Sequence, residues 1–169
     1  GFPESHAASF ALLVYASCWI KCHEPAIFLA ALLNSQPLGF YTPSQLVQDA
    51  RRHAVEVRAV DVCHSHSDCT LEELHRRPQP AIRLGLRLVS GLGHASAMRI
   101  VAARAQRPFT DAGDLAQRAG LQLHEMKLLA AADALASLSG HRRQQVWDAA
   151  AQHAPPPVLR QARICLLYT

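Results

Sequence analysis

The chain has 169 residues, of which half are apolar and 18% are charged, and its net charge is +4. This composition excludes a disordered or fibrous chain and fits one ordinary domain or two small ones. Ala and Leu are abundant and aromatic residues are few, so a mainly helical fold is favoured. The uncharged run 7–20 is too short to cross a bilayer, and no basic stretch or cleavage site accompanies it. We therefore expect neither a membrane segment nor a secretory signal.

Five cysteines occur at irregular spacing, an odd number that argues against a disulfide framework and for a reducing, cytoplasmic location. Two of them, Cys18 and Cys22, are interpreted as small core residues of a buried helix. The cluster of Cys63 and Cys69 with His64 and His66 fits no common zinc spacing, so no metal site is expected.

Three helices are predicted in the first third of the chain. Residues 4–23 are apolar nearly all round, which is typical of a buried helix. Pro25 suits the first turn of a second helix, 25–33, because its missing N–H has no helical partner to lose. Thr42 and Gln45 form a capping box around Pro43 and start a third helix that ends near residue 53. Residues 1–54 are therefore assigned to one helical region.

The period then changes to that of short strands. Val55, Val57 and Val60 alternate with polar residues, and a second short strand is expected near 69–71. The clearest strand is 82–88, where four Leu and Ile side chains alternate with Arg83 and Arg87 on the outward face. Residues 55–77 are interpreted as a short strand and loop connection.

Four more helices are predicted, at 94–105, 111–120, 123–136 and 140–153. Pro108 ends the first of them, and Asp111 is well placed to favour the start of the next. The predicted fold is thus mainly α with a small β element (α+β), with a helical module at 78–153 and a disordered or truncated tail at 154–169.

Positive charge is concentrated in the middle of the chain. Residues 74–110 contain no carboxylate but carry seven arginines. A solvated surface normally mixes both signs, so this window indicates a polyanionic partner. The alternative is that the arginines of an Arg-rich chain fall in this window by chance. The seven are Arg76, Arg77, Arg83, Arg87, Arg99, Arg104 and Arg107.

The most informative motif is Gly91-Leu92-Gly93 at the start of the helix predicted from His94. Glycines let the backbone turn tightly at positive φ, and the helix then presents unpaired N–H groups and its dipole at the same point. Such a site binds phosphate without a charged side chain. The residues expected to contact phosphate lie in this turn and on flanking arginines: Ser90, Gly91, Leu92, Gly93, His94, Ala95, Arg83, Arg87, Arg99 and Arg104.

The segment resembles the helix-hairpin-helix motif, which binds the sugar-phosphate backbone without reading sequence. Ala119-Gly120-Leu121 looks like a second, degenerate copy, so the resemblance implies a tandem module. The predicted element before the first hairpin is a strand, whereas the motif has a helix there.

A second resemblance covers roughly residues 1–153. Residues 1–11 and the helix pair after them look like the end of the fingers region of C-family bacterial DNA polymerases, the polymerase III alpha-subunit group. Residues 36–41, 55–58 and 68–72 are similar to the error-prone branch of that family.

This resemblance implies damage-induced, translesion synthesis of DNA by template-directed nucleotidyl transfer, with Mg²⁺ as the cofactor of the whole polymerase. The chain has no Asp-x-Asp, so we expect no catalytic residue here, no cofactor of its own and no activity alone. The implied partners are primer-template DNA, bound without regard to sequence, and the rest of the polymerase chain. A sliding clamp and mutagenesis accessory proteins are further candidates, and no membrane is expected.

The resemblance places Ser5 and His6 near the incoming nucleotide and template. The residues alone favour a simpler interpretation, in which Ser5 caps a helix and His6 is a polar first-turn residue.

Two other functions stay open. One is a stand-alone, non-enzymatic helix-hairpin-helix module of a repair or competence protein, which would not need the apolar, charge-poor residues 1–50. The other is a helical protein-interaction domain, in which Gly91-Leu92-Gly93 is only a turn and no salt-dependent DNA binding occurs.

Overall fold

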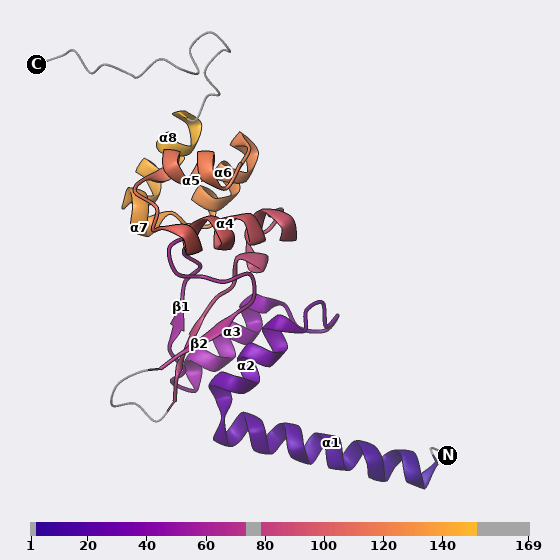
Figure 1. The fold of residues 1–169 in the computed structure, drawn as a ribbon. Coiled ribbons are helices and arrows are strands. Elements are labelled where there is room, and N and C mark those ends of the chain that lie inside the picture. Colours follow the sequence, from indigo (N-terminus) through magenta and orange to yellow (C-terminus); the bar gives the residue numbers. More distant parts are fainter. Residues whose placement is uncertain (1–2, 74–78, 152–169) are drawn as a thin grey trace, which may run out of the picture.

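The computed structural model describes residues 3–73 and 79–151. The predicted tail 154–169 lies outside the described residues, as do Arg76 and Arg77. For Ser5 the backbone is described but the side chain is not. The fold is mainly α with a small sheet, as predicted. Figure 1 shows the first helix at one end, the helices of the C-terminal half at the other, and the strands between them beside the second and third helices.

Helices α1 (Glu4–His23), α2 (Pro25–Asn34) and α3 (Pro43–Arg52) confirm the three helices predicted in the first third of the chain. The capping box of α3 is also confirmed. The Thr42 hydroxyl accepts a hydrogen bond from the Gln45 N–H at 3.3 Å, and the Gln45 side chain accepts one from the Thr42 N–H at 2.9 Å. These bonds satisfy two N–H groups that the helix itself cannot, so they fix where α3 begins.

The prediction that α1 is buried is wrong for this chain. Its described side chains are exposed, among them Leu12 (69%) and Tyr15 (70%), and Cys18 and Cys22 are exposed rather than part of a core. Helix α1 projects away from the other elements and approaches α2 near the C-terminal end of α1 (Figure 1). An apolar circumference predicts that a helix needs covering, but the covering surface is not among the described residues. None of the described helices has the length and apolarity of a membrane span.

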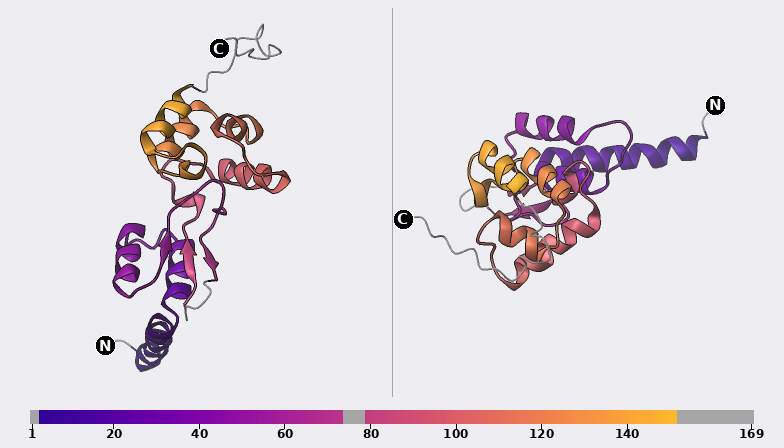
Figure 2. Two further views of the ribbon diagram at one scale, coloured as in Figure 1. Left: turned by 90° about the vertical axis from the view of Figure 1, so that its left-hand side faces the viewer. Right: turned by 90° about the horizontal axis from the view of Figure 1, so that it is seen from above.

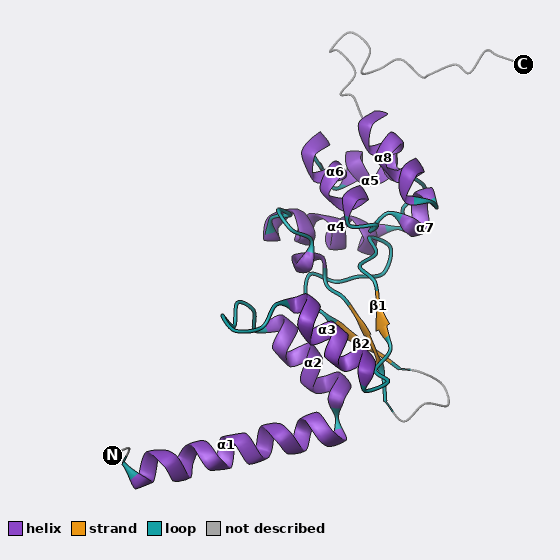
Figure 3. Ribbon diagram, turned by 180° about the vertical axis from the view of Figure 1, so that it is seen from behind, coloured by secondary structure: helices purple, strands orange, loops and turns teal. Residues whose placement is uncertain are grey.

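Three short strands form the sheet, β1 (Val57–Arg58), β2 (Thr70–Glu72) and β3 (Ala81–Arg83), in the order β1-β3-β2. The central strand β3 runs parallel to β1 and antiparallel to β2. Helices α2 and α3 lie beside the sheet, as Figure 3 shows from behind.

The strand predicted over 82–88 is wrong beyond Arg83. Residues Leu86–Leu88 form a 3-10 helix, η1. The cause is Gly85, where an added Cβ would lie 2.5 Å from the carbonyl oxygen of Ser67. At this close approach the amides of Leu86 and Arg87 bond the carbonyls of His66 and Ser67 at 2.9 and 3.0 Å, and the chain turns. Arg83 and Arg87 therefore do not share a strand face, and a helical turn precedes the hairpin.

The C-terminal half consists of α4 (His94–Gln106), α5 (Ala112–Arg118), α6 (Leu123–Ala131), α7 (Ala136–Ser139) and α8 (Arg142–Ala151). The helix predicted over 123–136 is interrupted after α6 by Asp133, at φ +58°. The Ala134 amide then bonds the Leu129 carbonyl at 2.9 Å, which closes α6, and Asp is among the residues that tolerate this left-handed conformation.

Two hydrophobic clusters form the core. The larger begins at Val60 and Val62 and includes buried residues of α4, α5, α6 and α8. The smaller joins α2 and α3 to Ile82 of β3. Leu84 packs against both clusters, so the helical module and the sheet region are continuous. Figure 2 shows α4–α8 stacked beyond the sheet, at the end away from α1.

Candidate nucleic-acid interface

The first hairpin joins η1 to α4. The Leu92 amide bonds the Val89 carbonyl at 3.1 Å, and both side chains are buried and anchor the turn in the core. Gly91 has φ +81°, as predicted for the tight turn. Gly93 does not share that conformation: it is the N-cap of α4 at φ −68°, which any residue adopts. Only Gly91 is therefore required by backbone geometry.

The N-terminus of α4 is open. Within the described residues, no acceptor is present for the N–H groups of Gly91, Gly93, His94 and Ala95. No side chain caps the helix, no acidic residue lies in its first turn, and these residues are exposed together with Ser90. Unpaired N–H groups and the positive end of the helix dipole make this point a site for an anion.

Two of the predicted phosphate-binding arginines are bonded within the chain on the sheet side. The Arg83 Nε donates to Glu72 at 2.8 Å, and that hydrogen bond lowers the pKa of Glu72. Arg87 donates to Asp68 Oδ1 and to the Asn34 carbonyl, both at 2.9 Å. The window 74–110 has no carboxylate of its own, but Glu72 of β2 and Asp68 of the loop before β2 offset the charges of Arg83 and Arg87.

The other two predicted arginines lie on α4. Arg99 donates to the Ala119 carbonyl at 2.8 Å and pairs with Glu125 at 3.3 Å, while its side chain stays 44% exposed. Arg104 donates to the carbonyls of Val62 and Ser65 at 2.7 and 2.8 Å. Burial lowers the pKa of Arg104, and in the described residues its guanidinium bonds main-chain carbonyls rather than a carboxylate, so its charge is not paired.

The second hairpin, between α5 and α6, is closed at the N-cap N–H of α6, although the described residues show no acceptor for the N–H groups of Leu123 and His124. Gly120 has φ +59°, but the Gln122 amide at the start of α6 donates to the Glu125 carboxylate at 2.6 Å. Glu125 is only 6% exposed and also accepts from the hydroxyl of Ser96 on α4. Burial alone would raise the pKa of Glu125, but the bonds from Ser96 and Gln122 and the charge of Arg99 outweigh it and hold the pKa below its ordinary value.

Sequence reasoning did not single out Glu125. A signal was present, because Gln122 and Glu125 have the spacing of a capping box. The contacts to Ser96 and Arg99 had no local signal, since they join residues 29 and 26 positions apart.

Ser5 and His6 belong to the first turn of α1, whose N-cap is Pro3. The N-terminal end of α1 lies far from α4 in Figure 1. The His6 ring packs edge-on against Phe10, with ring centroids 4.5 Å apart. The structure therefore does not bring these two residues together with the hairpin. In the part of the chain that the structure describes, no group of three or more His, Cys, Asp or Glu side chains is arranged to hold a metal ion.

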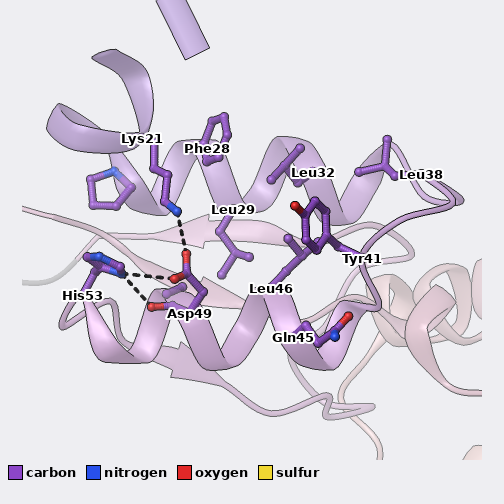
Figure 4. Close-up of a pocket in the computed structure, with 12 residues that line it drawn as sticks. Lys21, Phe28, Leu29, Leu32, Leu38, Tyr41, Gln45, Leu46, Asp49 and His53 are labelled. Carbon is purple, nitrogen blue, oxygen red and sulfur yellow. Dashed lines mark hydrogen bonds and ion pairs between the residues drawn. The ribbon is translucent and has the colours of Figure 1, made fainter. Parts of the chain in front are cut away.

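A groove of about 520 Å³ lies between α2 and α3 and has no counterpart in the sequence motifs (Figure 4). Its lining is mostly apolar and includes Phe28, Leu29 and Leu32 of α2. At one end Asp49 forms an ion pair with Lys21 at 2.9 Å, and the hydrogen bond from Lys21 lowers the pKa of Asp49. The groove belongs to the α2–α3 region and is separate from the hairpin.

Comparison with known proteins gives two results. A family model described as "Helix-hairpin-helix motif" matches residues 54–145, more than half of the chain. Error-prone DNA polymerases are similar to 93–97% of the chain: that of Aromatoleum aromaticum is 62% identical over 167 residues, that of Azoarcus sp. (strain BH72) 59% over 169 and that of Methylococcus capsulatus 55% over 175. The chain spans only 16–17% of the length of these curated relatives.

Proposed function

Since the chain belongs to the helix-hairpin-helix family, we propose that it is the segment of a bacterial error-prone DNA polymerase that binds the backbone of primer-template DNA. The observation that carries this proposal is the open N-terminus of α4, where the N–H groups of Gly91, Gly93, His94 and Ala95 have no acceptor in the described residues. A phosphate oxygen is the acceptor that such a terminus binds in nucleic acids.

The binding is independent of sequence because main-chain N–H groups supply it. These groups reach phosphates, which are the same at every nucleotide step, and they carry no information on base edges. Arg104 adds positive potential because its charge is not paired in the described residues, and Arg99 adds some because it stays 44% exposed although it pairs with Glu125. Arg83 and Arg87 add less, because Glu72 and Asp68 pair with them and their side chains are less exposed. Ser90 completes the proposed contact surface around Gly91, Gly93, His94 and Ala95. Leu92, also predicted to contact phosphate, is buried with its N–H bonded to the Val89 carbonyl, so it anchors the turn instead.

The relatives' name supports the polymerase part of the proposal. The whole protein would carry out translesion, damage-induced DNA synthesis in the cytoplasm with Mg²⁺, and Ser5 and His6 would lie near its nucleotide and template. The catalytic carboxylates would belong to sequence other than this chain, which has no Asp-x-Asp. The rest of that polypeptide would cover α1, and a sliding clamp and mutagenesis accessory proteins would be further partners.

The exposed apolar surface of α1 favours this proposal over a stand-alone DNA-binding module. Leu12, Tyr15 and Trp19 are each at least half exposed, and an independent module would have no use for such a surface. The proposed division is 1–54 for the fingers end, 55–77 for the connection and 78–153 for the tandem hairpin module.

Fluorescence anisotropy of the full 169-residue chain on two unrelated primer-template duplexes tests DNA binding. We expect equal affinities within about twofold and a slope of log K against log salt of about −1 to −3, because one to three phosphates lose counterions. A strong preference for one duplex, or a flat salt response, would contradict the proposal.

Primer extension tests the placement of the active site. With Mg²⁺, all four nucleotides and a primed template, the chain alone should incorporate no nucleotide, whereas it should still bind the template. Template-dependent extension by the purified chain would show that catalytic groups lie within it.

A further inference from the structure

We propose that Ser67 orients the imidazole of His94 so that the ring becomes an additional hydrogen-bond donor to the phosphate bound at the first hairpin. This rests on the proposed phosphate site at the start of α4. It adds a side chain from another segment, the 61–67 loop, whose role is to position His94 rather than to touch DNA.

The two residues meet at the open end of α4. His94 is the first residue of the helix and is exposed, next to the unpaired N–H groups of Gly93 and Ala95. The Ser67 Oγ lies 3.2 Å from the His94 Nδ1, and Ser67 is only 9% exposed. A buried hydroxyl thus holds the inner nitrogen of a solvent-exposed ring.

Ser67 is held rigidly by its surroundings. Its carbonyl accepts the Arg87 amide at 3.0 Å, and Gly85 allows this close approach because it has no Cβ. On the other side of the same loop, Arg104 of α4 donates to the Ser65 carbonyl at 2.8 Å. The loop is therefore bound to η1 and to α4, and its hydroxyl has a fixed place relative to the hairpin.

The Ser67 hydroxyl can donate to the His94 Nδ1 or accept from it, and the proposal assigns the hydroxyl the donor role. In the described residues, the His94 Nδ1 is the one acceptor recorded for the Ser67 hydroxyl proton. A neutral imidazole carries one N–H, so an accepting Nδ1 leaves the proton on Nε2. The ring then presents an N–H donor beside the main-chain donors that bind phosphate, and no charge has to be buried.

A double-mutant cycle on the full chain separates this role from a purely structural one. His94→Ala should weaken binding to a DNA duplex by about tenfold, the effect typical of losing a hydrogen bond to a charged group. Ser67→Ala should weaken it by about threefold, and Ser67→Ala in the His94→Ala background should have no further effect. If Ser67→Ala weakens binding equally in both backgrounds, the serine acts through the fold and the proposal is overturned.

The tautomer itself can be read without DNA, from the long-range ¹H–¹⁵N correlations of the His94 ring in alkaline buffer, in which imidazoles are neutral. We expect the proton on Nε2 in the parent and a mixture of tautomers in Ser67→Ala. Ser65→Ala is the matched control: it removes a buried hydroxyl from the same loop, one that bonds Leu84 O rather than His94, and should leave the tautomer unchanged.

The outcomes distinguish this proposal from the function on which it rests. A parent chain that does not bind DNA contradicts both. A parent that binds DNA, while His94→Ala binds equally well or the parent ring is already a mixture of tautomers, overturns the role of Ser67 and His94 alone.

Discussion

The two hairpins have similar backbones but different N-termini at the helices that follow them. Each turns at a glycine with positive φ, Gly91 at +81° and Gly120 at +59°. After the first hairpin the N–H groups of α4 are open, whereas after the second the Gln122 N–H at the start of α6 is occupied by the Glu125 carboxylate. A carboxylate is an anion as phosphate is, so the second hairpin carries its own substitute for the ligand.

The difference suggests a division of labour within the tandem module. Arg99 and Ser96 of α4 both bond elements of the second hairpin, through the Ala119 carbonyl and the Glu125 carboxylate. The closed hairpin thus supports the helix whose N-terminus is open. One hairpin is free to bind, and the other holds it in position.

The largest effect should come from Gly91→Ala, with Gly120→Ala as its matched control. Both place a Cβ at positive φ, which costs about 1 kcal/mol of stability. At Gly91 the new Cβ would also lie 3.2 Å from Leu128 Cδ1, whereas nothing lies within 4 Å at Gly120. We expect Gly91→Ala to weaken DNA binding by about tenfold or more through lost phosphate hydrogen bonds.

Gly120→Ala should bind within about twofold of the parent. Anisotropy measures the affinities, and urea denaturation measures the stability that each variant loses, the loss being larger in Gly91→Ala because of its contact with Leu128. Equal loss of DNA affinity in both variants would mean that the second hairpin also binds DNA, and the comparison would fail.

Glu125→Gln should affect folding stability more than DNA affinity. Removing the charge weakens the bonds from Gln122, Ser96 and Arg99, so the free energy of unfolding should fall by about 1–3 kcal/mol. DNA affinity should fall by less than in Gly91→Ala, because the N–H groups at the N-terminus of α4 stay without an acceptor. Urea denaturation measures the stability and anisotropy measures the DNA affinity. Glu73→Gln, at an exposed residue, is a control that should leave both unchanged.

Acid should reduce the contribution of Glu125 to the free energy of unfolding. Its pKa is held below its ordinary value, so the carboxylate stabilises the fold at pH values above the unfolded-state pKa of about 4.3. That contribution is lost as pH falls through the lower, folded-state pKa. The stability difference between parent and Glu125→Gln should therefore be largest near neutral pH and shrink towards pH ~3 in chemical denaturation. A difference that grows in acid would contradict the assigned shift.

The smallest effect is expected at Arg83. Glu72 pairs with it, so Arg83→Gln should change DNA affinity by less than about twofold and leave the salt slope unaltered. Arg99→Gln should have the larger effect of the two, because Arg99 is 44% exposed and lies on α4. Anisotropy over a salt series compares them, and a larger loss at Arg83 would mean that its ion pair opens to bind DNA.

The sequence predicted what local chemistry decides. The capping box at Thr42 and Gln45 located α3, and Gly91 located the hairpin, because both signals act within a few residues. The prediction failed where distant segments decide. The strand over 82–88 ended early because Gly85 packs on Ser67, and the arginine-rich window gained partners from Glu72, Asp68 and Glu125.

Dependence on distant segments also explains why the burial of α1 was predicted wrongly. Its apolar circumference correctly indicates a helix that needs a cover, but periodicity does not say which chain segment provides that cover. In the described residues α1 stays exposed, so burial was the wrong expectation although the helix itself, Glu4–His23, was right.

Leu84 couples the two cores thermodynamically. It packs against both hydrophobic clusters and lies between β3 and η1, a few residues before the hairpin. A ligand that binds only the folded state stabilises whatever unfolds together with its site, by an amount set by its concentration relative to Kd. Because both cores share this side chain, DNA bound at the hairpin should raise the melting temperature of the sheet and of α2 and α3 as well, in one cooperative transition.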